Sequence, residues 1–206
     1  LALFARGDTN GVFQFESAGI KNVLRKLRPT DFEDVVAVNA LYRPGPMENI
    51  DTFIARKNGQ EPIAYPDPAL EKILKPTYGV LVYQEQVMQV ASVMGGFSLG
   101  EADLLRRAMS KKKSSVLAAE QDKFIEGAVK QGFPEATAKT VYAYIDRFAN
   151  YGFNRSHAVA YSMVAFWLAY LKVHDPAAFF AALMNASMNN LPKLRTYVQE
   201  AKARQV

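Results

Sequence analysis

The chain has 206 residues, half of them hydrophobic, which is enough to bury a sizeable core in one large domain or two small ones. It has no cysteine and only two histidines, so disulfides, cysteine nucleophiles and ordinary zinc sites are excluded, and we expect a cytoplasmic location. The longest apolar run, residues 158–171, is shorter than the roughly 20 residues that cross a membrane. We therefore expect a buried helix there and no membrane partner.

Helical periodicity dominates, so we expect a mainly α fold, a multi-helix domain with one or two short β-strands. Residues 10–16 alternate like a short strand, and residues 79–83 could form another strand or the entry to a helix. A helix should follow residue 83 and end at residue 94. The other expected helices cover residues 17–28, 30–41, 47–57, 68–74, 98–113, 115–130, 134–149, 157–174, 176–188 and 192–204.

Capping residues and helix breakers set these expected boundaries. Ser17 can cap the first of the helices, and Thr30 with Glu33 and Ser98 with Glu101 have the spacing of capping boxes. Proline and glycine end helices at residues 29, 43–46, 58–59 and 95–96. The chain starts with leucine, shows no signal peptide and ends inside a helical pattern, so we expect a piece of a longer protein.

Positive charge is concentrated in one place. Basic residues outnumber acidic ones by 25 to 20, and residues 106–113 carry five positive charges with no negative one. On the helix after Ser98, Ala102, Leu105 and Met109 form an apolar stripe that can face a core, so the basic residues have a rigid support. Such a cluster attracts nucleic acid, nucleotide phosphates or an acidic membrane surface; the alternative is a solvated helix face.

Residues 151–158 form a second candidate region. Gly152 permits a positive φ angle, Ser156 can cap the next helix, and that helix start offers free amide donors to phosphate. Asn154, Arg155 and His157 add side-chain donors, although the same residues could simply connect two helices.

The acidic residues predict no metal site, because no two of them converge in an evident way. A hydrolase that uses His157 or His174 as general base is also disfavoured, because no nucleophile or oxyanion arrangement accompanies either histidine.

Five stretches together resemble the alpha subunits of bacterial DNA polymerase III, the replicative C-family polymerases, and the match spans nearly the whole chain. They are residues 11–17 (GVFQFES), 40–46 (ALYRPGP), 77–88 (TYGVLVYQEQVM), 96–109 (GFSLGEADLLRRAM) and 151–158 (YGFNRSHA). The family usually has glycine at the position of Ser110 and lysine at that of Arg155, and both differences preserve size or charge. The resemblance implies a palm-proximal segment at residues 1–16 and a helical fingers domain at residues 17–206 that continues beyond both ends.

The resemblance also implies residue roles. Arg106 and Arg107 would contact the phosphates of the incoming deoxynucleoside triphosphate, as arginine pairs with phosphate through two hydrogen bonds. Asn154, His157 and Arg43, the last on a stiff turn, would line the nucleotide pocket. The expected DNA-binding residues are Lys111, Lys112, Lys113 and Arg155.

Catalysis would belong to the full-length enzyme, a DNA-directed DNA polymerase. Its palm aspartates would lie before residue 1 and bind Mg²⁺, so we expect the isolated fragment to be inactive and to bind no metal. Expected partners are primer–template DNA, deoxynucleoside triphosphates, the rest of the alpha chain and, through regions outside the fragment, replisome subunits. The alternative is a non-catalytic helical module for nucleic-acid binding or protein interaction.

Overall fold

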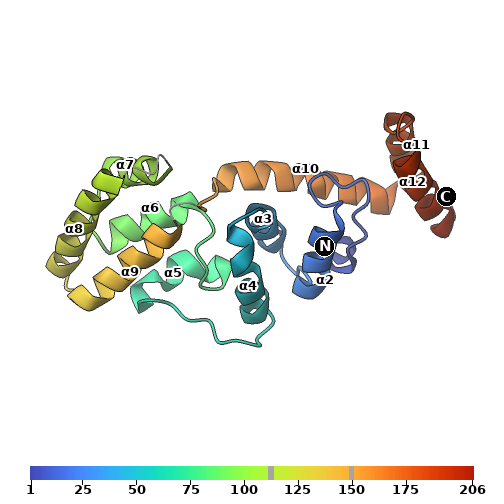
Figure 1. Ribbon diagram of the computed structural model, residues 1–206. Coiled ribbons are helices and arrows are strands. Elements are labelled where there is room, and N and C mark those ends of the chain that lie inside the picture. Colours follow the sequence, from blue (N-terminus) through green and yellow to red (C-terminus); the bar gives the residue numbers. More distant parts are fainter. Residues whose placement is uncertain (111–113, 149–150) are drawn as a thin grey trace. The chain divides into compact units, whose positions relative to one another are not determined.

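The computed structural model describes residues 1–110, 114–148 and 151–206, and this part of the chain is mainly α-helical, which confirms the expected fold class (Figure 1). Its α-helices are α1 (Ala2–Arg6), α2 (Ala18–Leu27), α3 (Phe32–Leu41), α4 (Ile50–Lys57), α5 (Glu71–Leu74), α6 (Gln84–Val93), α7 (Leu99–Ser110), α8 (Ser114–Lys130), α9 (Glu135–Phe148), α10 (Arg155–His174), α11 (Pro176–Ala186) and α12 (Leu191–Ala203). Short 3-10 helices are η1 (Pro46–Asn49), η2 (Pro68–Leu70) and η3 (Lys75–Thr77).

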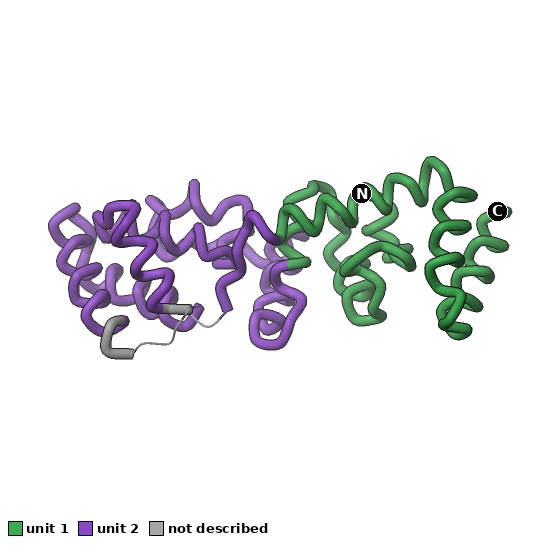
Figure 2. The backbone as a smooth tube through the Cα atoms, turned by 90° about the horizontal axis from the view of Figure 1, so that it is seen from above, with its two compact units in different colours: residues 1–39, 158–206 green, residues 40–157 purple. Residues whose placement is uncertain are grey.

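The chain divides into two compact units, which are described separately (Figure 2). Unit 1 comprises Leu1–Asn39 and Ala158–Val206, and unit 2 comprises Ala40–His157. The boundaries fall inside α3 and α10. The division at residue 16 that the resemblance implies concerns the longer protein and stays a prediction.

A buried lysine ties together three parts of unit 1. The side chain of Lys172 on α10 has no exposed surface, and its ammonium group donates to the carbonyl oxygens of Asp8 at 2.8 Å and Asn10 at 2.7 Å. It also lies 2.8 Å from Oε1 of Glu200 on α12. Burial lowers the pKa of Lys172, and the hydrogen bond to Glu200 opposes that effect. All three ammonium donors are thus satisfied, which is the condition for burying such a charge.

Residues 10–16 do not form the expected strand. Gly11 and Gln14 both have positive φ angles, +75° and +69°, and the amides of Val12 and Phe15 each donate to a carbonyl three residues back. Val12 and Phe15 are both fully buried in these consecutive turns. The alternating apolar residues thus belong to turns and not to a strand, because positive φ angles are incompatible with an extended strand.

Helix α10 is not the buried helix that its apolar sequence predicts. Its covered residues are small ones and one lysine, whereas most of its large apolar side chains are exposed. The prediction assumed that large apolar residues face the core. Unit 1 covers instead the stripe of Ala158, Ser162, Ala165, Ala169 and Lys172.

The N-terminus of α3 is capped one residue later than predicted. Asp31, not Thr30, accepts a hydrogen bond from the amide of Glu33, at 2.9 Å. Asp34, not Glu33, returns to the start of the helix and accepts from the amides of Thr30 at 2.9 Å and Asp31 at 3.2 Å. Both patterns place an acceptor at the helix start, and aspartate satisfies the first-turn amides as well as threonine does.

The hydrophobic core of unit 2 is formed by side chains from η2 through α9. Its fully buried members include Leu74, Val87 and Phe124, and the pairs α6–α7 and α8–α9 pack side by side. A Cβ atom on Gly127 of α8 would overlap the carbonyl oxygen of Gly95, which follows α6. The two backbones therefore touch at this point.

Among the described residues, no helix is both long and apolar enough to cross a membrane. The 20 residues of α10 do not meet this condition.

We predict that Lys172→Met lowers the free energy of unfolding of unit 1 by about 1–3 kcal/mol, because it leaves the carbonyl oxygens of Asp8 and Asn10 without their donor, whereas Glu200 keeps its bonds to Arg204 and Asn10. Urea titration with hydrogen exchange resolved by residue measures this. Lys193→Met is the control, since that ammonium is exposed and lies 3.9 Å from Glu16. Equal stabilities of the two variants would show that the buried network contributes nothing.

Candidate functional site

A short backbone pairing in unit 2 joins the segment before α6 to the segment before α10. The amide of Phe153 donates to the carbonyl of Val82 at 3.2 Å, and the amide of Gln84 donates to the carbonyl of Phe153 at 2.9 Å. These bonds form a parallel bridge between Tyr83 and Phe153. Gly79 lies in a turn with a φ angle of +79°, and residues 80–83 lead into α6, so within the described residues the expected strand is reduced to this isolated bridge.

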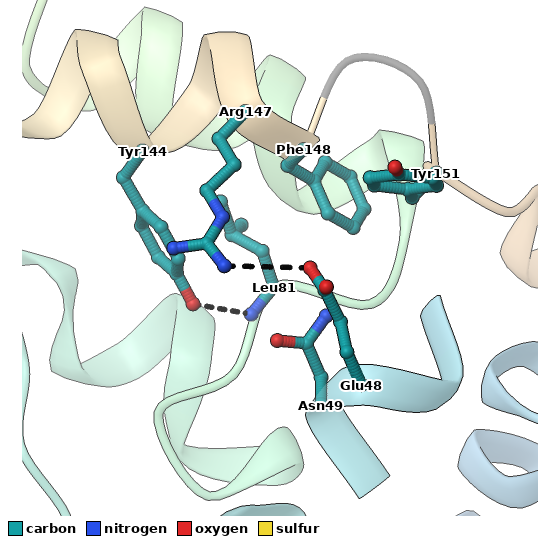
Figure 3. Close-up of a pocket in the computed structure, with 7 residues that line it drawn as sticks. All are labelled: Glu48, Asn49, Leu81, Tyr144, Arg147, Phe148 and Tyr151. Atoms are coloured by element: carbon teal, nitrogen blue, oxygen red, sulfur yellow. Dashed lines mark hydrogen bonds and ion pairs between the residues drawn. The ribbon is translucent and has the colours of Figure 1, made fainter. Parts of the chain in front are cut away.

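Gln86 and Tyr144 hold residues 80–83 in place. The buried side-chain oxygen of Gln86 accepts from the amides of Val82 at 2.9 Å and Tyr83 at 3.0 Å, and its amide nitrogen donates to Oγ1 of Thr77 at 2.8 Å. The hydroxyl of Tyr144 on α9 accepts from the amide of Leu81 at 2.9 Å (Figure 3). The segment that precedes α6 is therefore fixed from both sides.

Glu85 occupies the N-terminus of α10. Its carboxylate accepts from the amide of Arg155 at 3.1 and 3.0 Å and from Nδ2 of Asn154 at 2.9 Å. Oδ1 of Asn154 accepts from the amide of His157 at 2.8 Å, so Asn154, not Ser156, caps the helix. The amides of Arg155 and His157 were expected to be free for phosphate, but both are used by protein groups.

Arg43 reaches the same region from the turn after α3. Its Nε donates to the carbonyl of Ala40 at 2.9 Å, its Nη2 donates to the carbonyl of Tyr151, and the guanidinium lies 4.7 Å from the centre of the Phe153 ring. Burial lowers the pKa of Arg43. At Gly45, where φ is +101°, a Cβ atom would overlap the ring of Tyr151. The turn must therefore carry glycine here, and Arg43 is held against residues 151–153.

The two predicted phosphate-binding arginines share one carboxylate on α7. Nη2 of Arg106 lies 2.8 Å from Oδ1 of Asp103, and Nε of Arg107 lies 2.7 Å from its Oδ2. The hydrogen bond from Arg106, with the charges of both arginines, holds the pKa of Asp103 below its ordinary value. Because two guanidinium groups share one carboxylate, the cluster keeps an excess of positive charge.

Gln84 connects this cluster to the loop before α10. Its side-chain oxygen lies 3.4 Å from Nη1 of Arg106, and its Nε2 donates to the carbonyl of Gly152 at 3.2 Å. Nearby, the Arg155 guanidinium lies 5.9 Å from the centre of the Tyr83 ring, and the ring centres of His157 and Phe153 are 5.5 Å apart. Arg106, Asn154, Arg155, His157 and Arg43 thus belong to one region of unit 2, linked through residues 82–85.

Two other features delimit this region. Lys111, Lys112 and Lys113 lie outside the described residues. Glu48, Tyr144, Arg147 and Tyr151 line a small pocket next to Leu81, where Arg147 lies 3.4 Å from Glu48 (Figure 3). Within the part of the chain that the structure describes, no three histidine or acidic side chains gather as a metal site would require.

Sequence reasoning missed Gln84, Glu85, Gln86 and Asp103 as parts of the site. The first three belong to the motif TYGVLVYQEQVM, but no role followed from it. Their sequence signal is a polar run directly after the mostly apolar residues 79–83. Asp103 bonds both Arg106 and Arg107, and its only sequence signal is the ordinary spacing of three and four residues on one helix.

The comparisons with known proteins all indicate the same family. Residues 1–132 match the family model described as the bacterial DNA polymerase III alpha subunit finger domain. The chain is 59% identical over 98% of its length to a DNA polymerase III subunit alpha of Halalkalibacterium halodurans, 57% over 98% to one of Bacillus subtilis and 50% over 97% to one of Aquifex aeolicus. It spans only 17–18% of the length of these relatives.

The helix that carries the arginines begins with the predicted capping box. The amide and hydroxyl of Ser98 each donate to Oε2 of Glu101 at 2.8 Å, and Nζ of Lys123 on α8 lies 2.7 Å from Oε1. The hydrogen bond from Lys123, followed by those from Ser98, lowers the pKa of Glu101 from 4.5 to about 2.

We predict that this carboxylate makes unit 2 less stable in acid. The pKa of Glu101 is lower in the folded chain than in the unfolded chain, so as the pH falls the unfolded chain binds the proton first. The stabilisation is therefore complete above pH 4.5 and is lost as the pH falls toward 2. Glu101→Gln should remove this part of the pH dependence, measured as the melting temperature between pH 6 and pH 2 (roughly the range over which carboxylates titrate). Glu71→Gln, in a looser exposed pair with Lys75, is the control. Parallel pH profiles of wild type and Glu101→Gln would contradict the assignment.

Proposed function

This chain belongs to the finger-domain family of bacterial DNA polymerase III alpha subunits, and we propose on that basis that it holds the triphosphate of an incoming deoxynucleotide in a replicative DNA-directed DNA polymerase. The observation that carries the proposal is the shared carboxylate of α7. Arg106 and Arg107 are both oriented by Asp103 and still carry an excess positive charge. An anion with several oxygens, such as a triphosphate, is the natural complement of two oriented guanidinium groups.

The charge of the arginines suits the chemistry of nucleotide transfer. As the new phosphodiester bond forms, negative charge develops on the leaving pyrophosphate, and donors that are already oriented stabilise that charge without reorganisation. Arginine keeps its proton near neutral pH, so its contribution does not depend on a titration. In this proposal α7 binds and stabilises phosphate, and it moves no proton.

The remaining predicted residues form the border of the proposed site. Asn154 and Arg43 fix the loop before α10 through their hydrogen bonds, and the side chains of His157 and Arg155 flank it. We propose that His157, Asn154 and Arg43 bound the nucleotide, and that Arg155 with Lys111, Lys112 and Lys113 contacts the DNA backbone. For the three lysines the proposal rests on sequence alone.

Metal chemistry would belong to other parts of the full-length subunit. Among the described residues, no three histidine or acidic side chains gather into a metal site. The proposal for this chain therefore involves no step through a metal, and it assigns the catalytic carboxylates to polypeptide outside residues 1–206.

We predict that Arg107→Ala in the full-length subunit lowers the rate of nucleotide incorporation roughly 10²- to 10³-fold, because it removes an oriented donor from the transition state. Affinity for duplex DNA should stay nearly unchanged. Single-turnover incorporation and DNA-binding titrations measure the two effects. Lys139→Ala is a matched control, because Lys139 is equally exposed and forms the same kind of i,i+4 pair with Glu135. Equal incorporation rates for the two variants would exclude the proposed role.

We predict that changing Lys111, Lys112 and Lys113 together to Gln makes DNA binding less sensitive to salt. The slope of log affinity against log salt concentration should become shallower by about 0.9 for each duplex phosphate contact that is lost. The control changes Lys72, Lys75 and Lys130 to Gln, which gives the same net charge. An identical slope for both triple variants would show that only overall charge matters.

A further inference from the structure

Helix α10 has two faces of opposite character within unit 1. The face toward unit 1 consists mainly of small residues, Ala158, Ser162, Ala165 and Ala169, at alternating spacings of four and three residues. The opposite face, here called the outer face, carries large apolar side chains. Its members are Met163, Val164, Trp167, Tyr170 and Leu171.

The outer face is too apolar for a surface that stays in water. Trp167 is 60% exposed, Tyr170 57% and Leu171 49%. From residue 158 to residue 173 the only charged residue is Lys172, and it points into unit 1. Helices that are apolar on all sides occur in the cores of large proteins, and contiguous exposed apolar patches mark contact surfaces.

The covering partner can be inferred from two observations. First, the relatives that this chain matches are more than five times longer, since it spans 17–18% of their length. Most of the full-length polypeptide thus lies outside residues 1–206. Second, the lack of charge on the outer face is typical of permanent contacts and of protein cores, whereas transient contacts carry more polar residues.

A hollow at the edge of the outer face indicates which part of the polypeptide arrives there. Leu1 and Leu3 line this hollow together with Phe166, Tyr170 and Val173. In a longer chain, the residues that precede Leu1 would join the chain at the rim of this hollow. Arg6 and His174 also line the hollow, and beyond them an apolar segment that fills it continues along Trp167 over uncharged side chains.

We propose that the outer face of α10 is the docking surface for the polypeptide that precedes Leu1 in the full-length subunit. The helix is then a buried connector with unit 1 on its small-residue side and the preceding polypeptide on its large-residue side. The proposal rests on family membership and on unit 1, and it is independent of nucleotide binding at α7.

Cysteine labelling of the full-length subunit tests this proposal, because residues 1–206 contain no cysteine of their own. Trp167→Cys and Leu171→Cys should react with a maleimide at least about 100-fold more slowly than Lys202→Cys, an exposed position on α12, because labelling must await local opening. Ala165→Cys, fully buried in unit 1, gives the lower limit. Rates are read from peptide mass spectra, which separate these sites from cysteines elsewhere.

Fast labelling at both Trp167→Cys and Leu171→Cys would overturn the proposal. Protection that disappears on dilution would identify a second copy as the occupant, and protection that requires added DNA would identify nucleic acid; either result also overturns it. A photo-crosslinker attached at Leu171→Cys then identifies the neighbour. Crosslinks to residues before Leu1 support the proposal, and crosslinks only to residues 1–206 or to residues after Val206 contradict it.

Discussion

The candidate site depends on one short pairing of backbone segments, between residues 82–84 and Phe153. This pairing brings two helix starts together, so that Glu85 of α6 reaches the first amides of α10 and Gln84 reaches both Gly152 and Arg106. Buried backbone amides need hydrogen-bond acceptors, and the side-chain oxygen of Gln86 accepts from the amides of Val82 and Tyr83, which do not donate within the bridge. Without the pairing, the arginines of α7 and the loop before α10 would have no common support.

Most helix boundaries could be predicted because their signals are local. Ser98 and Glu101 form the expected capping box, Ser17 accepts from the amide of Ile20, and the Gly95–Gly96 step ends α6. Caps and breakers act within three or four residues, so the sequence near each end contains the whole cause. The cap of α3 moved by one residue because three neighbouring acids could serve equally well.

Features that depend on distant contacts were not predictable in the same way. The alternation in residues 10–16 fits a strand or a pair of turns, and the choice depends on φ angles that burial of Val12 and Phe15 imposes. The site was predicted mainly as a set of basic residues, and their role in binding stays a prediction. Its anionic and amide partners, Glu85 and Gln84, were missed because hydrogen bonds across about 70 residues leave no periodic signal in sequence.

The contact between Gly127 and Gly95 has a consequence for how sequence variation in this family should be interpreted. The backbone of α8 contacts the carbonyl oxygen of Gly95, so even a methyl group at position 127 would push α8 away from the end of α6. The packing of α7 against both helices would then weaken. A glycine found at position 127 in every relative would thus indicate that the two backbones must pack this closely. It would carry no information about the residues of the candidate site.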